Sequence, residues 1–485
     1  MEHAGRIVTR QGILAIIGMA TIWTAVHNQL MYPITFTYAK AGAPAPITLY
    51  LAYAVLQLLT CAGIFAARRR VERALFSHPI FMAVLGALGI VGTVLLIVCD
   101  FASAASTLCV AVGVALFSLY VPTFFVFWAT RLASLGDGTH AGGHTVALGV
   151  IASYVLFCLF TALRLLLDIH ASIVGLVYPC VGTVLAVGVA RFRGEAPGTA
   201  SGTFAIKQLP LNVIVPSLAF VYLCAFLITL LNPVTSLSEH PPRRAVLYIL
   251  DALLFVLVAL IYLRSPNALK RCAMQTFAVL SIYLVGAVLL TGLGTIDAFN
   301  VGNFAAIAGK NAFDLFILLL VLVSVHNKHV QPAGPTVVYY AVALLVPHLI
   351  SALLTSQGTL APSPSTDGFY ILTLIVVAAF LVSAAANVIL IFFVARTPKG
   401  SFADADTLAR PIEPTTFDQV QTAWNLSNRE VEIVRLACTN ASTSKISSSL
   451  CIAESTVYTH LKRIYRKAGV HSRQELVDLV ETFKK

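Results

Sequence analysis

Charged residues are scarce in this sequence. Only 11% of its 485 residues are Asp, Glu, Lys or Arg, whereas soluble globular domains contain roughly 25%. Hydrophobic residues make up 58%, and the mean hydropathy is +0.86. These values exclude an ordinary soluble protein, because so apolar a chain cannot cover its surface with polar groups. Most of the chain is therefore expected to face lipid.

Motifs for metal binding, disulfides and catalysis are missing as well. The nine cysteines are odd in number and form no Cys-x-x-Cys pair, and most lie in apolar stretches, where cysteine behaves as a small buried hydrophobic residue. The sequence has no phosphate-binding glycine loop and no nucleophile–base pair with usable spacing. We therefore expect no metal, no cofactor and no enzymatic activity.

Long apolar stretches fill residues 1–396, which we interpret as one polytopic membrane domain. A spanning helix needs about 20 apolar residues. Twelve spans are expected, at about 12–32, 46–67, 79–99, 104–130, 144–167, 170–190, 210–231, 245–263, 273–293, 300–325, 335–356 and 370–395. The loop at about 191–208 divides them into two sets of six. Loops on one side carry most of the arginines and lysines, which places both termini in the cytoplasm.

This layout of two six-helix halves resembles the major facilitator superfamily, in which two bundles enclose a central ligand site. The resemblance is one of topology. The loop after the second span reads Ala-Arg-Arg-Arg-Val-Glu-Arg and lacks the Gly-Asp-Arg-Gly pattern of many such transporters. Gly86, Gly89 and Gly92, in the third span, are expected to allow close helix packing.

Ionisable residues inside the expected spans are candidates for function, because charge is costly in lipid. Lys310 and Asp314 are four residues apart, so they share a helix face and can neutralise each other. Asp251 needs a partner, and Lys310 is one possibility. Two interpretations stay open: a structural ion pair, or a lining that meets a charged or polar ligand. With Asn303, these residues are the candidate ligand-binding residues for an unidentified small molecule.

The composition changes after residue 396. Residues 397–417 contain Pro398, Pro411 and Pro414 and are expected to form a linker, followed by a domain at 418–485. That domain reads Leu-Ser-x-Arg-Glu from Leu426, Thr-Val-x-x-His from Thr456, Ile-x-x-Lys-x-Gly-Val from Ile464, and Ser-Arg at 472–473. It resembles the DNA-binding domain of LuxR-type bacterial transcription factors, a four-helix helix-turn-helix module.

Helices are expected at about 428–438, 444–450, 455–468 and 473–483. Ser427 and Glu430 form a capping-box pattern at the first, and Ala453 stands at the N-cap of the third, where the family has Ser. In the third helix, Val457, Leu461 and Ile464 recur at helical spacing and should face the core. The outward side chains suit the DNA major groove.

The resemblance implies a DNA-binding surface on this third helix and double-stranded DNA as a partner. The expected DNA-binding residues are Ser455, Thr456, Tyr458, Thr459, His460, Lys462, Arg463, Arg466, Lys467 and Arg473. It also implies a homodimer on DNA, paired through the fourth helix at Leu476, Leu479 and Val480.

Together these features predict an all-α protein with a twelve-helix membrane bundle and a C-terminal helix-turn-helix domain. We interpret it as a one-component transcriptional regulator in the bacterial inner membrane, which senses a ligand through its spans and binds operator DNA. The alternative is a major-facilitator-like transporter with a regulatory cytoplasmic tail.

Overall fold

The structure is a computed structural model of the chain. It describes residues 10–26, 46–101, 107–135, 142–169, 171–191, 209, 211–231, 241–264, 296–327, 331–347, 349–350, 414–438, 443–450 and 452–482, with scattered residues between 353 and 389. The chain divides into two compact units, Met1–Ala403 and Asp404–Lys485, called the N-terminal and C-terminal units below. Within the described residues all regular elements are helices, which confirms the all-α fold.

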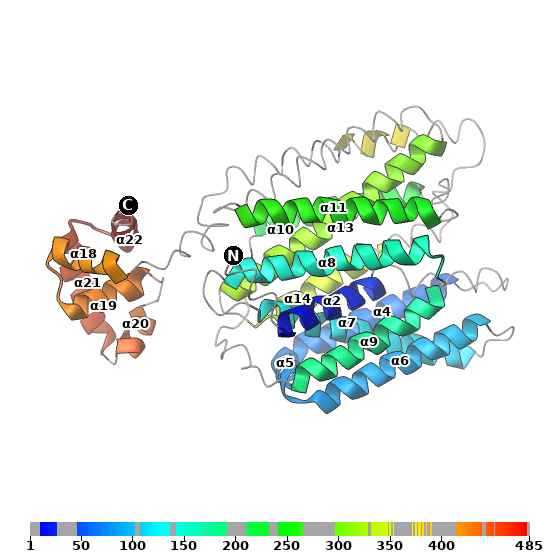
Figure 1. Ribbon diagram of the computed structural model, residues 1–485, viewed down its shortest axis with the longest axis horizontal. Helices are drawn as coiled ribbons and strands as arrows, with labels where there is room; N and C mark the ends of the chain where they lie inside the picture. The colour runs from blue at the N-terminus through cyan, green and yellow to red at the C-terminus, as the bar shows by residue number, and fades with distance from the viewer. Residues whose placement is uncertain are drawn as a thin grey trace. The chain divides into compact units, whose positions relative to one another are not determined.

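The N-terminal unit is a bundle of apolar helices (Figure 1). Its elements are α2 (Arg10–Val26), α4 (Pro46–Ala66), α5 (Arg68–Ser77), α6 (Pro79–Phe101), α7 (Thr107–Ala133), α8 (Gly142–Leu166), α9 (Ala171–Arg191), α10 (Leu211–Leu231), α11 (Pro241–Arg264), α13 (Ile296–Asn327), α14 (Ala333–Tyr339) and the π-helix η3 (Tyr340–Leu345).

Most of the expected spans coincide with these helices, and the two at 273–293 and 370–395 fall wholly or mostly outside the described residues. By length and composition, four segments suffice to cross a membrane: Pro79–Val98, Leu108–Ala133, Thr145–Leu166 and Ala306–His326. Further described segments, such as Arg10–Val26 and Leu51–Ala66, are apolar but shorter.

Small residues allow the helices of this unit to approach closely. α6 packs against both α7 and α9, and α8 packs lengthwise along α11 (Figure 1). On α6, Gly86 faces the Thr183 side chain of α9 and Gly89 faces the Tyr120 ring of α7, so closely that a β-carbon at either glycine would clash. The expected packing role of these two glycines is confirmed, as small residues are the usual contact points between helices in lipid.

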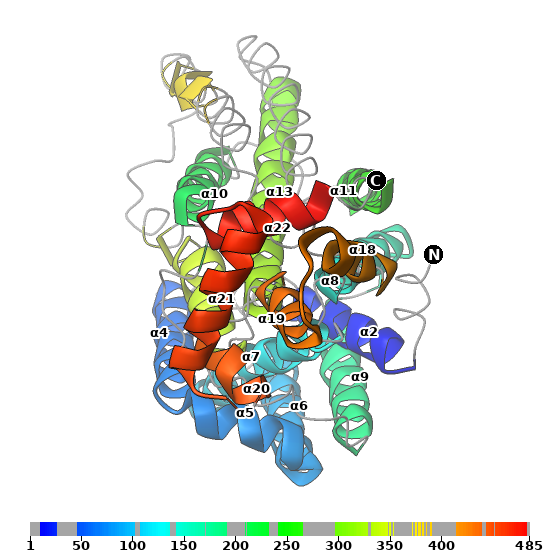
Figure 2. The same ribbon diagram turned by 90° about the vertical axis from the view of Figure 1, so that its left-hand side faces the viewer.

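The C-terminal unit contains α18 (Pro414–Trp424), α19 (Asn428–Cys438), α20 (Thr443–Leu450), α21 (Glu454–Ala468) and α22 (Arg473–Thr482), shown in Figure 2. The last four match the helices expected from the sequence. α18 was not expected. It begins inside the segment interpreted as a linker, and its Phe417 and Val420 are buried in the core of this unit.

Local signals in the sequence set the ends of these helices. The capping box at α19 is confirmed, because the backbone N–H of Glu430 donates to Ser427 Oγ over 3.3 Å and that of Ser427 donates to Glu430 Oε2 over 2.9 Å. Ala453 occupies the N-cap of α21 without a side-chain cap. Gly469 ends α21 at φ 71°, a left-handed conformation that glycine adopts without a steric penalty.

Candidate nucleic-acid interface and membrane site

Helix α21 separates into a buried face and a polar face. Val457, Leu461 and Ile464 are buried in the core of the C-terminal unit, as predicted. The opposite side exposes Ser455, Tyr458, Thr459, Lys462, Arg463 and Arg466. We call Tyr458, Thr459, Lys462, Arg463 and Arg466 the polar face of α21. It presents a phenol, a hydroxyl and three cations on one rigid helix, a combination that can reach base edges and neutralise phosphates.

Neighbouring residues support this face. Thr443, at the start of α20, donates from its hydroxyl to the phenol oxygen of Tyr458 over 3.4 Å, which links α20 to α21. Thr456 and His460, which were among the expected DNA-binding residues, are half-buried at the edge of this face. The contact of Thr443 was not predicted from the sequence, because Thr443 lies 15 residues before Tyr458 and belongs to a different helix.

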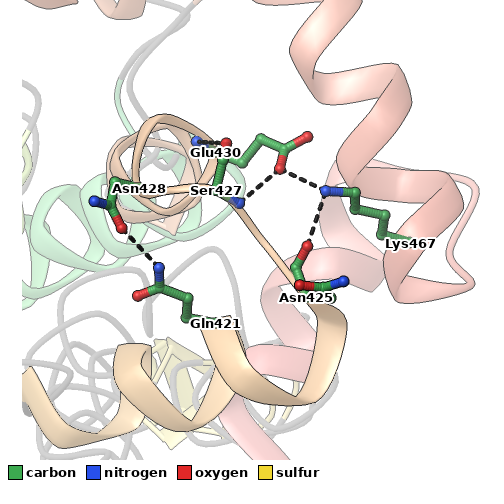
Figure 3. Close-up of polar contacts among 6 residues, drawn as sticks. All are labelled: Gln421, Asn425, Ser427, Asn428, Glu430 and Lys467. Carbon is green, nitrogen blue, oxygen red and sulfur yellow. Dashed lines mark hydrogen bonds and ion pairs between the residues drawn. The ribbon is translucent and has the colours of Figure 1, made fainter.

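Lys467 is engaged within the protein. Its ammonium group donates to Glu430 Oε2 over 2.7 Å and to the backbone oxygen of Asn425 over 2.9 Å (Figure 3). Burial acts to raise the pKa of Glu430, but the hydrogen bonds from Lys467 and Ser427 and the Lys467 charge outweigh it, so the pKa lies below its ordinary value. Lys467 thus fastens the end of α21 to the start of α19.

Arg473 also has a structural contact. Its guanidinium Nη2 donates to the backbone oxygen of Ala437, near the end of α19, over 2.9 Å, and the side chain is half-buried. The structure therefore separates the expected cations into two groups. Lys462, Arg463 and Arg466 are exposed together on α21. Lys467, which is also exposed, and the half-buried Arg473 form hydrogen bonds to other parts of the C-terminal unit.

The expected pairing surface on α22 requires a correction. Leu476 and Val480 are completely buried in the core of their own unit, and Leu479 is half-buried. The family resemblance pointed to these residues, but they lie on the face that α22 packs against the rest of the unit. Leu476 and Val480 therefore cannot supply a surface for a second copy.

The candidate ligand residues of the N-terminal unit are all buried. Lys310 donates to Asp314 over 2.6 Å, so the expected pairing one turn apart on α13 is confirmed. Asp251, on α11, is 3% exposed and accepts a hydrogen bond from Asn311 over 3.1 Å. Its partner is therefore a neutral amide that the sequence analysis did not name. Asn303 is buried on α13, seven residues before Lys310 and thus on the same face.

A series of aromatic contacts begins beside Asp251. On α11, Phe255 lies one turn from Asp251, and its ring meets Tyr154 of α8 edge-on at 5.0 Å. Tyr154 meets Trp23 of α2 at 5.6 Å, and Trp23 meets Phe125 of α7 at 5.4 Å.

A second set of contacts leads from Phe125 back to α13. Phe125 stacks on Tyr339 of α14 at 6.0 Å, and Tyr339 donates to the backbone oxygen of Asp314 over 2.7 Å. The contacts close a circuit through six helices. We call the residues of this circuit the membrane centre: Asp251, Asn311, Asp314, Tyr339, Phe125, Trp23, Tyr154 and Phe255.

Several buried polar atoms at or beside the membrane centre have no hydrogen-bond partner in the part of the chain that the structure describes. They are Asp314 Oδ1, Thr336 Oγ1 on α14 and Gln57 Nε2 on α4. The carbonyl oxygen of the Gln57 side chain accepts from the Tyr340 phenol over 2.8 Å. Buried polar groups are normally hydrogen-bonded, so such atoms mark places where water or a ligand belongs. Across the described residues, no group of three His, Cys, Asp or Glu side chains could hold a metal ion.

The sequence comparisons match the C-terminal unit. Residues 424–480 match the model of the luxR family of bacterial regulatory proteins. The Fimbriae Z protein of Escherichia coli (strain K12) is 39% identical over 59 residues, which cover 12% of this chain and 28% of that protein. The match to this chain therefore spans about a quarter of the length of this relative. α18 lies almost entirely before residues 424–480, the segment that matches the luxR family.

The structural comparison matches the other unit. A crystal structure of a bacterial homologue of the iron transporter ferroportin, in an outward-facing state with soaked iron, aligns over 80% of this chain and 100% of that chain. The sequence identity is 13% and the TM-score 0.51, a likeness of fold. The chain thus combines an N-terminal helical unit whose fold is like that of this transporter homologue with a C-terminal unit in which residues 424–480 match the luxR family of bacterial regulatory proteins.

Proposed function

We propose that this protein is a membrane-integrated, one-component transcriptional regulator and not an enzyme. The C-terminal unit binds operator DNA through the polar face of α21, and the N-terminal unit senses a small ligand. Ligand binding favours one conformation of the N-terminal unit, and the equilibrium between DNA-binding and non-binding states shifts by the difference in ligand affinity. Both termini lie on the cytoplasmic side of the bacterial inner membrane, where the DNA is.

The observation that carries the proposal is the exposed polar face of α21. Lys462, Arg463 and Arg466 project from one side of α21, and the apolar residues of its other side are buried in the core. This face carries polar and charged groups, so it needs no apolar partner to cover it. In a nucleic-acid groove, its hydroxyl groups and cations would bind base edges and phosphates. Binding as a homodimer to two half-sites about one helical turn apart is part of the proposal, with a pairing surface other than Leu476 and Val480.

The test is DNase footprinting of full-length protein in nanodiscs, and of residues 404–485, on the intergenic DNA that flanks the gene. Protection of a pseudo-palindrome is expected at low salt. Lys462→Ala and Arg466→Ala should each weaken binding and reduce the salt dependence by about one counterion. Arg435→Ala is the matched control, since that cation lies on α19 and covers the Phe417 ring at 4.7 Å. Absence of protection by folded full-length protein would refute the proposal.

Transport is the second candidate function, and the likeness of the N-terminal unit to a transporter fold favours it. A transporter with a regulatory tail predicts ligand flux into proteoliposomes that persists when Lys462 and Arg466 are replaced. The regulator predicts loss of transcriptional response from the same replacements. Measuring flux and a reporter gene with one set of variants separates the two functions.

A further inference from the structure

The charges of the membrane centre are unbalanced. Among the described residues, it and its immediate neighbours contain two carboxylates, Asp251 and Asp314, and one ammonium group, Lys310. The ammonium group of Lys310 lies 2.6 Å from the Asp314 carboxylate and Lys310 is 6% exposed, so its charge is already paired with that of Asp314. Asp251 accepts a hydrogen bond from the neutral amide of Asn311, and within the described part of the chain no ion pair to Asp251 is formed. A carboxylate inside a membrane domain is costly unless it takes up a proton or a positive charge joins it.

The surroundings of Asp251 suit one kind of cation. Tyr248 and Phe255 lie three residues before and four residues after Asp251 on α11, so they share its helix face. Their rings contact α8, Tyr248 at Phe157 over 5.8 Å and Phe255 at Tyr154 over 5.0 Å. Aromatic faces attract ammonium groups, and more strongly where water is excluded.

We infer that the membrane centre binds an organic ammonium ion, with Asp251 as its anionic partner and the surrounding rings as its cage. The inference rests on the proposed function, in that it names the class of ligand which the N-terminal unit senses. An ammonium group supplies the charge that Asp251 lacks, and the apolar part of the ligand contacts rings such as Trp23 and Tyr154. For an anionic ligand, the ammonium group that the described residues place here is that of Lys310, and it is already paired with Asp314.

The unpartnered atoms of the same region provide independent support. Asp314 Oδ1 is an acceptor with no hydrogen-bond partner among the described residues, and Asp314 is completely buried. Thr336, also completely buried, lies one turn before Tyr339 and Tyr340, and its hydroxyl likewise has no described partner. Asp314 Oδ1 can accept from the N–H groups of an ammonium ion, and the Thr336 hydroxyl can bind a polar substituent of the ligand.

The experiment uses full-length protein in nanodiscs and three probes with one ring and different head groups. Phenethylammonium, phenethyl alcohol and phenylacetate carry a positive, zero and negative charge at neutral pH. Calorimetric titration should show the ammonium probe binding at least about tenfold more tightly than the alcohol, and the carboxylate binding most weakly. Asp251→Asn keeps the size of the side chain and should abolish most of this preference. Asp418→Asn, an exposed position on α18, is the matched control and should leave the preference intact.

A second variant guards against a folding defect in Asp251→Asn. Phe255→Leu removes one ring next to Asp251 and should weaken binding of the ammonium probe more than that of the alcohol. Equal affinities for the three probes, tighter binding of phenylacetate, or no binding of any probe would overturn the inference. So would an unchanged preference in folded Asp251→Asn protein. Operator binding is measured on the same samples, so that loss of DNA binding with an intact ammonium preference counts against the proposed function alone.

Discussion

At the scale of single residues, the carboxylate of Glu430 shows how one side chain holds two helices together. It accepts from Ser427 at its own helix and from Lys467 on α21 (Figure 3). Its pKa is lower in the folded protein than the ordinary glutamate value, which is about 4.3. A carboxyl with a lowered folded pKa adds stability above its unfolded pKa, and this contribution is lost as the pH falls through the folded value.

Glu430→Gln should therefore remove part of the acid sensitivity of the C-terminal unit. Urea unfolding of residues 404–485 between about pH 6 and about pH 3 is expected to show a smaller loss of stability for the variant than for the parent. Glu432→Gln is the control, because Glu432 forms an exposed pair with Arg429 and exposed pairs contribute at most about 1 kcal/mol. Identical pH profiles for the parent and Glu430→Gln would contradict the prediction.

Tyr458 is the residue we expect to read sequence on the polar face of α21. Its side chain is 59% exposed and its phenol is positioned by Thr443. Tyr458→Ala should weaken binding to the best operator by about 1–3 kcal/mol and should relax the preference at one base position. Binding to unrelated DNA should hardly change, because the cations remain. A selection experiment on randomised operators compares the two proteins, and an unaltered consensus would count against this role.

What the sequence predicted at this scale was local. The pairing of Lys310 with Asp314 and the capping box of Ser427 with Glu430 follow from spacings of three or four residues, which helix geometry fixes. The partner of Asp251 could not be predicted, since Asn311 is 60 residues away in the chain. The structural use of Lys467 was missed for the same reason: its two acceptors lie on another part of the chain.

At the scale of elements, α18 extends the DNA-binding domain beyond the segment that resembles the luxR family. The prolines of residues 397–417 indicated a linker. Phe417, Val420 and Trp424 nevertheless recur at helical spacing, a signal that was available in the sequence. The burial of Phe417 and Val420 and the hydrogen bond from Gln421 to Asn428 over 2.8 Å attach α18 to α19.

Phe417→Ala tests that attachment. The ring is 5% exposed and is covered by the Arg435 guanidinium, so truncation should lower the free energy of unfolding of residues 404–485 by about 3 kcal/mol. Gln419→Ala, at an exposed position on the same helix, should change it by no more than about 0.5 kcal/mol. Urea denaturation measures both. A loss below about 1 kcal/mol for Phe417→Ala would show that α18 is only loosely attached.

At the scale of the whole molecule, the division into two units was predictable because hydropathy and charge change together near residue 396. Which side chains meet inside the N-terminal unit was not. Its helices are apolar on nearly all sides, so periodicity does not tell an inward aromatic residue from one that faces lipid. Trp23, Phe125 and Tyr339 come from three separate parts of the chain, and only the fold brings their rings together.

The proposed regulator makes a thermodynamic prediction that neither unit can satisfy alone. If a ligand at the membrane centre changes operator affinity by some factor, operator DNA must change ligand affinity by the same factor. With full-length protein in nanodiscs, we expect a coupling of about fivefold or more in both directions. Residues 404–485 alone should bind operator with an affinity that does not change when the ligand is added, since the membrane centre is absent. Titrations of the ammonium probe with and without operator, and the converse, measure both factors. A ligand that shifts operator affinity while operator leaves ligand affinity unchanged would mean that the effect does not pass through a shared conformational equilibrium of the two units.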